Sequence, residues 1–253
     1  MSVSGNHVVF LYGWASHAQV FRGLARALEK NFRVQVMALP GYEGTASCTP
    51  YTLERIADTL AASAPKRCSV VGWSLGAQVA LTWAQRAPKQ VHRLALIAAT
   101  PCFTQRTDWP QAVAPAVMRQ FTAQIKRDIP SVLRRFVGLQ SIGDKQAVRV
   151  AHKLRTALFT HPLPDLAVLE SGLEILRTAD LRNTLTLIQQ PTLALHGEHD
   201  AITPCAAGEA LSQALTNARF HKIAGAGHAP FLSDPGVVGT LLQEFLDASL
   251  TTV

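Results

Sequence analysis

One serine of the chain has neighbours that could make it a nucleophile. Ser74 is the central residue of Gly72-Trp73-Ser74-Leu75-Gly76, a G-x-S-x-G pattern. An apolar run precedes the pattern and a helical run follows it, which is the strand-turn-helix context that this motif requires. The two glycines permit a turn sharp enough to raise the serine hydroxyl above the edge of a sheet. A turn that serves only close packing is the alternative, and the flanking strand and helix make it the weaker one.

A serine hydroxyl needs a base to accept its proton, and the base needs a carboxylate, in the chain order Ser, Asp, His. His228 lies in the small-residue loop of IAGAGHAPFLSDP, after the last predicted strand. Asp200 lies in LALHGEHDAITP, after the strand before it, and Glu198 in the same loop is the competing acid. The chain has eight other histidines, but only His228 combines such a loop with this order. We therefore predict a triad of Ser74, Asp200 and His228.

Acyl transfer also requires N–H donors for the negative charge that develops on the carbonyl oxygen. The N–H of Leu75, at the start of the helix after Ser74, is one candidate. The N–H of Trp14, in the loop Tyr12-Gly13-Trp14-Ala15, is the other. We expect the indole of Trp14 to form a pocket wall alongside Trp73. The alternative is that both tryptophans are ordinary core residues.

The elements that must position these residues follow an alternating pattern. Short apolar runs rich in Val, Ile, Leu and Ala alternate with helical patterns, as expected of an α/β fold with a mostly parallel sheet and helices on both faces. Strands are predicted at 8–14, 32–41, 68–73, 91–100, 192–197 and 218–225, and a last helix near 236–249. About 80 residues after Thr100 have helical periodicity interrupted by Pro and Gly, which predicts a helical lid. The predicted division is a core part at 1–101, a lid at 102–183 and a second core part at 184–253.

Composition excludes several classes of protein. With 48% hydrophobic and 16% charged residues in 253, the chain cannot be a disordered scaffold. No uncharged apolar run reaches the roughly 18 residues of a membrane span, and the first ten residues lack the basic flank of a signal peptide. The four cysteines are far apart, without C-x-x-C spacing, which favours a reducing cytoplasm. Because HExxH, P-loop and GxGxxG motifs are missing from the sequence, we expect neither a metal nor a cofactor.

The net charge of +7 is concentrated in one segment. Residues 119–155 contain nine Lys and Arg against Asp128 and Asp144, so this segment accounts for the entire excess. The segment lacks interleaved aromatic residues and any recognition motif, which argues against a nucleic-acid partner. It indicates an acidic partner, with solubility of an apolar lid as the alternative.

Several longer segments resemble a known family. They are GWSLG at 72–76, LPGYEGT at 39–45, PCFTQRTDWP at 101–110, RRFVGLQSIG at 134–143, SGLEILRTADLR at 171–182 and GAGHAPFLSDP at 225–235. Together they are similar to the α/β-hydrolase superfamily and, within it, to the esterases that act on methyl-pimeloyl-acyl carrier protein in biotin synthesis. The resemblance spans nearly the whole chain, including the predicted lid. It implies a carboxylesterase that hydrolyses the methyl ester and has acyl carrier protein as its acidic partner.

The resemblance also implies roles for individual residues. Besides Ser74 and His228, the substrate is expected to contact Trp14, Leu75, Phe136, Val137, Gly138, Leu139 and Gln140. Carrier docking is expected at the basic residues Arg134, Arg135, Arg149 and Arg155. We expect a monomer with no cofactor, no nucleic acid and no membrane partner.

This sequence departs from the family in three respects, and other functions remain possible alternatives. Tyr12 replaces the family's histidine in the first loop, the family's leading strand is shortened, and Ser131 and Val148 stand where some relatives have arginine. A broad short-chain esterase or another lid-bearing hydrolase would have the same triad. A non-catalytic binding scaffold is disfavoured because Ser74 and His228 are both present.

Overall fold

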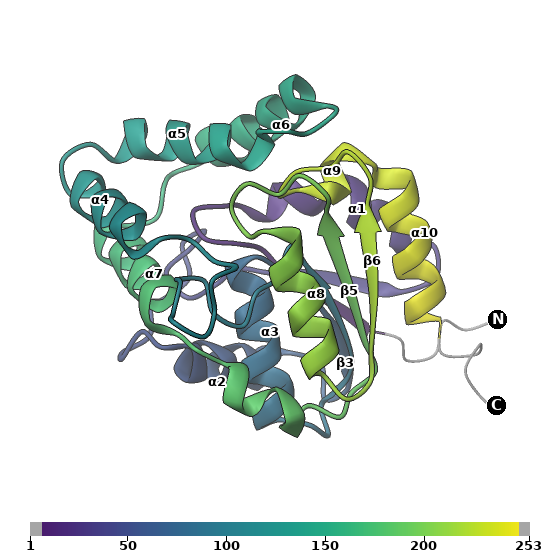
Figure 1. Cartoon of the computed structure of the whole chain (residues 1–253). Coiled ribbons are helices and arrows are strands. Elements are labelled where there is room, and N and C mark those ends of the chain that lie inside the picture. Colours follow the sequence, from purple (N-terminus) through teal and green to yellow (C-terminus); the bar gives the residue numbers. More distant parts are fainter. Residues whose placement is uncertain (1–6, 248–253) are drawn as a thin grey trace.

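The computed structural model describes residues 7–247, and its centre is a six-stranded sheet in which every strand is parallel to its neighbours. The strand order is β2-β1-β3-β4-β5-β6 (Figure 1). Every residue of β3 and β5 is buried, whereas most residues of the edge strands β2 and β6 are partly or fully exposed, because only inner strands are covered on both faces. The strands are β1 His7–Leu11, β2 Arg33–Met37, β3 Cys68–Trp73, β4 Val91–Ile97, β5 Thr192–Gly197 and β6 Ala218–Ile223.

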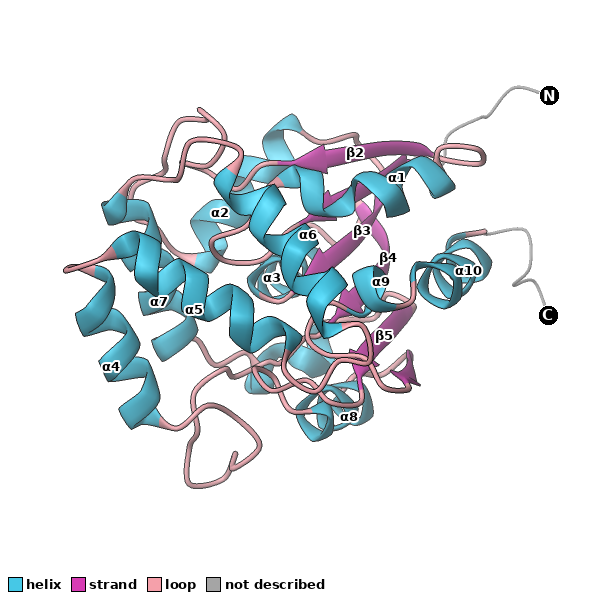
Figure 2. Ribbon diagram, turned by 90° about the horizontal axis from the view of Figure 1, so that it is seen from above, coloured by secondary structure: helices cyan, strands magenta, loops and turns pink. Residues whose placement is uncertain are grey.

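Helices cover both faces of the sheet, as predicted. Helices α2, α3 and α8 pack on one face and α1 and α10 on the other (Figure 2). Two 3₁₀ helices, η1 at Ala18–Phe21 and η2 at Arg182–Leu187, complete the core. The core helices are α1 Arg22–Leu28, α2 Leu53–Ser63, α3 Leu75–Arg86, α8 Cys205–Ala214, α9 Pro230–Ser233 and α10 Pro235–Leu246.

Several predicted elements are longer than those observed. The first strand ends at Leu11, so residues 12–14 form a loop instead of continuing the strand. The strand predicted at 32–41 ends at Met37, and the one at 218–225 ends at Ile223. After the first two strands the run continues into a largely buried loop, and composition alone cannot separate a buried loop from a buried strand, whereas residues 224–225 form a partly exposed turn. The predicted end of the last helix at residue 249 lies outside the described residues.

Four helices form the lid between β4 and β5, over the carboxyl ends of the strands (Figure 1). Their apolar faces belong to the same continuous core as the sheet, so the lid is packed onto the rest of the protein. The boundaries 1–101, 102–183 and 184–253 stay a prediction. Among residues 7–247, no helix is both long and apolar enough to cross a bilayer. The lid helices are α4 Pro115–Ile125, α5 Ile129–Ser141, α6 Ala147–Phe159 and α7 Leu166–Thr178.

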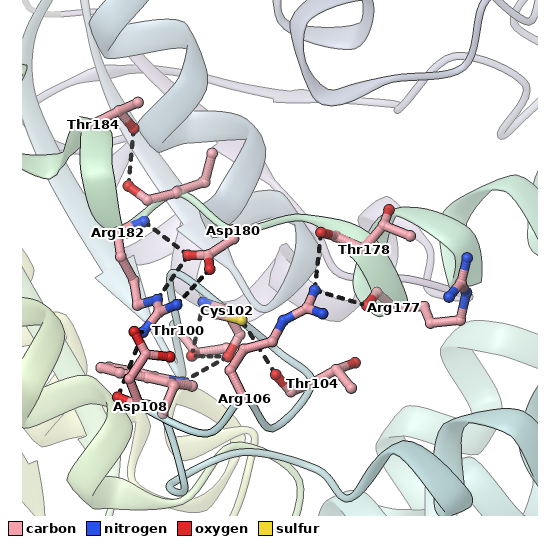
Figure 3. Close-up of polar contacts among 12 residues, drawn as sticks. Thr100, Cys102, Thr104, Arg106, Asp108, Arg177, Thr178, Asp180, Arg182 and Thr184 are labelled. Atoms are coloured by element: carbon pink, nitrogen blue, oxygen red, sulfur yellow. Dashed lines mark hydrogen bonds and ion pairs between the residues drawn. The ribbon is translucent and has the colours of Figure 1, made fainter.

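A polar cluster joins the two chain segments that connect the lid to the core (Figure 3). Cys102 and Asp180 form an isolated antiparallel bridge between these segments. Arg182 pairs with Asp180 at 2.7 Å and with Asp108 at 2.9 Å. Arg106 Nη2 donates to the Thr178 carbonyl at 3.2 Å. The lid is therefore tied at both stems by charge-assisted contacts, at a place distant in sequence but adjacent in space.

Candidate active site

Ser74 occupies the turn between β3 and α3. Its φ of 55° and ψ of −121° are unusual for a residue other than glycine. The turn needs glycine on both sides: a β-carbon at Gly72 would lie 2.6 Å from Ala77 Cα, and one at Gly76 would collide with the Leu11 carbonyl. The Ser74 N–H donates to the Ile97 carbonyl at 3.0 Å, which fixes the turn to the sheet. The sequence pattern thus produces the expected strained elbow.

His228 and Asp200 meet at the same edge of the sheet, after β6 and β5 respectively. Asp200 Oδ2 lies 2.8 Å from His228 Nδ1, and both side chains are almost completely buried. The backbone N–H groups of Ile202 and Thr203 donate to the other oxygen, Oδ1, each at 2.9 Å. The carboxylate therefore favours the tautomer of His228 with its proton on Nδ1, in which Nε2 is the basic nitrogen. Among residues 7–247, His228 Nε2 is buried without a hydrogen-bond partner.

The environment keeps Asp200 ionised. Burial by itself would raise the pKa of this carboxyl, but the charge of His228 and hydrogen bonds from His196 and His228 hold the pKa well below its usual range. Thr203 Oγ1 also donates to Asp200 Oδ2, at 2.7 Å. A permanent negative charge at this position can stabilise the imidazolium that forms when His228 accepts a proton.

Sequence reasoning missed His196 and Thr203. His196 Nε2 lies 2.7 Å from the Thr203 carbonyl and 3.3 Å from Asp200 Oδ2, so the acid has two histidines beside it. A β-carbon on Gly208 would collide with the ring of His196, which therefore packs directly on α8. A histidine as the penultimate residue of a buried strand, four residues before the acid, was the available signal.

Glu198, the competing acid, faces away from the base. Its Oε2 accepts from the Gly225 N–H at 3.0 Å, and Oε1 lies 3.7 Å from Lys222 Nζ. About a third of its side chain is exposed, in contrast to Asp200. Asp200 thus contacts His228, whereas Glu198 binds the backbone of the loop that leads to His228.

Trp73 links the serine to the histidine. Its indole N–H donates to the His228 carbonyl at 2.8 Å, and its ring packs edge-on against Phe21 and Phe231. We expected Trp73 to form a pocket wall with Trp14. That expectation is wrong for Trp73, because the residue before the nucleophile points back towards the base and supports it.

The first loop of the core approaches the nucleophile closely. A β-carbon at Gly13 would lie 3.0 Å from Ser74 Cβ and 3.4 Å from Ser74 Oγ, so any larger residue would press on the nucleophile. The backbone of Trp14 follows directly, while Leu75 begins α3 on the other side of Ser74. Of the two candidate oxyanion donors, Leu75 therefore adjoins the serine in the chain, and Trp14 belongs to the loop that approaches it in space.

Tyr12, at the family's histidine position, is fully buried below this loop. Its ring lies edge-on to Tyr42 at 5.8 Å, and the Tyr42 hydroxyl accepts from the Ala15 N–H at 3.2 Å. Burial, followed by the charge of Glu43, raises the pKa of Tyr12, so the phenol stays neutral. An aromatic pair thus supports the loop in this chain.

An apolar cavity of about 140 Å³ lies under the lid. Trp14 closes one side, with its ring edge-on to Phe136 at 5.0 Å and to Phe121 at 5.9 Å. The indole N–H donates to the Leu169 carbonyl at 2.9 Å, so the polar edge of Trp14 is already satisfied. The cavity suits a hydrocarbon chain. Its lining includes Trp14, Phe103, Met118, Phe121, Phe136, Leu139, Leu173 and Ile202.

The predicted substrate run 136–140 divides into different environments. Phe136 and Leu139, three residues apart on one face of α5, line the cavity. Val137 is buried, whereas a β-carbon at Gly138 would contact nothing within 4 Å. The Gln140 carbonyl accepts from the His228 N–H at 3.1 Å, so this residue contacts the base instead of the cavity wall.

The four candidate docking arginines are not equivalent. Arg134, Arg135 and Arg155 are exposed on α5 and α6. Arg149 Nη2 instead donates to the carbonyls of Leu232 and Ser233, at 3.2 Å and 2.7 Å. These contacts join α6 to α9, outside the lid, whereas Arg135 Nη1 donates to Gln124 Oε1 of α4, within the lid, at 3.3 Å. In residues 7–247, no group of three or more His, Cys, Asp or Glu side chains is arranged to hold a metal ion.

The chain matches a known fold family over nearly its whole length. The family model described as the alpha/beta hydrolase fold matches residues 6–235. An esterase from Exiguobacterium antarcticum superimposes with a TM-score of 0.86 at 23% identity, covering 97% of this chain and 93% of that one. MenH from S. aureus superimposes with a TM-score of 0.82 at 19% identity, covering 97% and 95%. These solved structures show the fold.

Relatives with higher identity carry a more specific name. A protein of Nitrosomonas europaea named pimeloyl-acyl carrier protein methyl ester esterase is 40% identical over 232 residues, which is 92% of each chain. A protein of Aromatoleum aromaticum with the same name is 39% identical over 242 residues, covering 94% of this chain and 96% of its own. The similarity thus includes both the sheet and the lid.

Proposed function

Because this chain belongs to the α/β-hydrolase family, and within it to the pimeloyl-acyl carrier protein methyl ester esterases, we propose that it hydrolyses the methyl ester of pimeloyl-acyl carrier protein. The products are pimeloyl-acyl carrier protein and methanol, and the reaction serves biotin biosynthesis. The observation that carries this proposal is the buried His228–Asp200 pair, which the indole of Trp73 joins to the turn of Ser74, together with the apolar cavity under the lid.

In the acylation step, Ser74 Oγ attacks the ester carbonyl carbon while His228 Nε2 accepts the hydroxyl proton. Asp200 stabilises the imidazolium through Nδ1. The negative charge on the former carbonyl oxygen is held by the N–H groups of Trp14 and Leu75. The intermediate collapses when His228 returns the proton to the methoxy oxygen, so methanol leaves and an acyl-serine remains.

Deacylation repeats these transfers with water. His228 takes a proton from a water molecule, the hydroxide attacks the acyl carbon, and the Ser74 oxygen leaves with the proton from His228. The free carboxylate then departs with its carrier. No cofactor enters either step, because nucleophile, base and oxyanion donors all come from the chain.

The substrate's hydrocarbon chain is proposed to lie along Trp14, Phe136 and Leu139, which line the cavity. Its ester end is proposed to lie at Ser74, Leu75 and His228. Burial of methylene groups in this cavity provides binding energy of about 0.8 kcal/mol for each CH₂. From the same run, Val137, Gly138 and Gln140 would shape the channel through the backbone of α5. Such a site favours a neutral ester end over a carboxylate, because the cavity wall is apolar.

Acyl carrier protein, a small acidic protein, is the proposed partner. The exposed Arg134, Arg135 and Arg155 on the lid would attract it, and Arg149 would contribute positive charge while it holds α6 to the core. We propose a monomer acting in the cytoplasm, and the four free cysteines, Cys48, Cys68, Cys102 and Cys205, support this compartment.

One comparison of substrates tests the function. The purified protein is offered methyl-pimeloyl-acyl carrier protein and p-nitrophenyl esters of increasing chain length, and kcat/KM is measured for each. We expect the carrier-bound methyl ester to be the best substrate. Equal or better turnover of short free esters would favour a broad short-chain esterase, and no turnover of any ester would contradict hydrolysis altogether.

A further inference from the structure

The lid reaches the catalytic loops through the turn that joins α5 to α6. This lid turn, defined as residues 140–146 so that it includes the last two residues of α5, runs beside the loop that carries the base, residues 224–229. The Gln140 carbonyl accepts from the His228 N–H at 3.1 Å. The Lys145 N–H donates to the Gly225 carbonyl at 2.7 Å. Two backbone hydrogen bonds thus join a lid segment to the base loop from opposite ends of the turn.

Asp144 provides a third link, through its side chain. Its Oδ2 accepts from the Gly227 N–H at 2.7 Å, and Gly227 immediately precedes His228. Its Oδ1 accepts from Ser233 Oγ at 2.9 Å and from the Gln146 N–H at 2.6 Å. The residue is only 7% exposed. One buried carboxylate therefore fixes the chain before the base, helix α9 after it and the start of α6.

The fit between the turn and the two catalytic loops is close. A β-carbon at Gly227 would lie 3.0 Å from the Gln140 carbonyl oxygen and 3.3 Å from Asp144 Cβ. Gly143 has a φ of +75°, and a β-carbon there would lie 2.9 Å from the Cβ of His199, the residue before Asp200. The lid turn therefore packs against the loop of the acid as well as the loop of the base.

We propose that Asp144 is a positioning residue for His228. It supplies the acceptor for the Gly227 N–H, and without it this donor would be left unsatisfied in a buried place. The loop would then shift to find another partner and would move the imidazole relative to Ser74. The inference depends on the proposed function in one respect, namely that His228 is the catalytic base.

The test compares Asp144→Ala with Asp128→Ala. Asp128 is a matched control, because it also lies in the lid and accepts a backbone N–H, from Ser131 at 3.0 Å, but it caps α5 on the exposed surface. Kinetics use p-nitrophenyl acetate, which needs the triad but no carrier. We expect Asp144→Ala to lower kcat about 10- to 100-fold while KM changes less than about twofold. Asp128→Ala should change kcat less than about twofold.

A conservative variant separates positioning from folding. Asp144→Asn keeps the size of the side chain but has one acceptor oxygen where the carboxylate has two, so kcat should fall about three- to tenfold, less than in the alanine variant. A wild-type kcat in Asp144→Asn would overturn the proposal even if Asp144→Ala does not fold. Equal kcat losses in the two alanine variants would also overturn it.

The wild type provides the check on the underlying function. A fluorophosphonate should label Ser74 in the wild type, and it should label folded Asp144→Ala more slowly in proportion to kcat. Unslowed labelling of that variant would count against positioning. A wild type that is neither labelled nor active on any ester would instead reject the proposed serine hydrolase, before any variant is considered.

Discussion

Ser74 stands in a backbone conformation that side chains seldom adopt, with its neighbouring glycines closed in by other backbone atoms. Strain of this kind persists where the surrounding structure over-determines it. We predict that Ser74→Ala lowers kcat on the order of 10³-fold or more, because only oxyanion binding and substrate binding remain. The circular dichroism spectrum should be unchanged. Mass spectrometry after fluorophosphonate treatment should find the label at Ser74, and near-normal turnover by the alanine variant would rule this nucleophile out.

Asp200 gives a second prediction at the scale of single residues, which concerns catalytic activity. In Asp200→Asn the amide can no longer hold the His228 Nδ1 proton as a carboxylate does, so the ring can adopt the wrong tautomer. We expect kcat to fall on the order of 10³- to 10⁴-fold. Glu198→Gln is the control, because Glu198 contacts Gly225 and not the base. If Glu198→Gln is the damaging change and Asp200→Asn is silent, the assignment of the acid is wrong.

The lowered pKa of Asp200 also predicts how stability depends on pH. The unfolded chain takes up a proton near the ordinary value of about 3.9, before the folded protein does. The contribution of Asp200 to stability is therefore complete above that value and is lost as the pH falls towards the folded pKa. In urea unfolding between pH 7 and pH 3, the wild type should lose stability more steeply below about pH 5 than Asp200→Asn. Parallel pH profiles for the two proteins would contradict this.

At the scale of elements, the lid helices α5 and α6 have two different uses for their arginines. All four are exposed, but Arg149 is also bonded to the end of α9. We predict that reversing Arg134, Arg135 and Arg155 to Glu lowers kcat/KM for the carrier-bound ester about tenfold or more, and that the loss shrinks as salt rises. Turnover of p-nitrophenyl butyrate should barely change, since this ester has no carrier.

Arg149→Glu is the contrasting variant. It removes hydrogen bonds to the carbonyls of Leu232 and Ser233, near the base loop, so it should lower kcat/KM for both substrates and lower the melting temperature.

For the triple variant, equal losses of kcat/KM on both substrates would show that the exposed charges support lid structure. No loss on either would leave them with a role in solubility.

At the scale of the whole molecule, lid and sheet share one core. Met118, Leu133 and Leu173 of the lid belong to the same buried cluster as the strands β1, β3 and β4. The stems are also tied by Arg182, with Asp180 and Asp108 (Figure 3). A lid that shares its apolar contacts with the sheet should not melt independently. We predict a single unfolding transition in urea, coincident by far-ultraviolet circular dichroism and tryptophan fluorescence. Two separated transitions would show an independent lid.

The sequence by itself determined the α/β class, the strand-turn-helix around Ser74 and the chain order of Ser74, Asp200 and His228. These features depend on local patterns: apolar runs that a covered parallel sheet requires, and glycines that a sharp turn requires. The run of helices between β4 and β5 was also predictable, because its helical periodicity replaces the alternation of strand and helix.

Only the tertiary structure decided which groups meet. In the folded chain Asp200 is hydrogen-bonded to His228, whereas Glu198 binds the Gly225 N–H, although the two acids are two residues apart in one loop. It used Arg149 for a structural contact and brought Asp144, 84 positions before the base, against the base loop. Sequence patterns record periodicity along one chain segment, whereas these contacts depend on how loops from different strand ends and from the lid pack together. Such long-range hydrogen bonds have no local signature, and therefore only the folded chain reveals them.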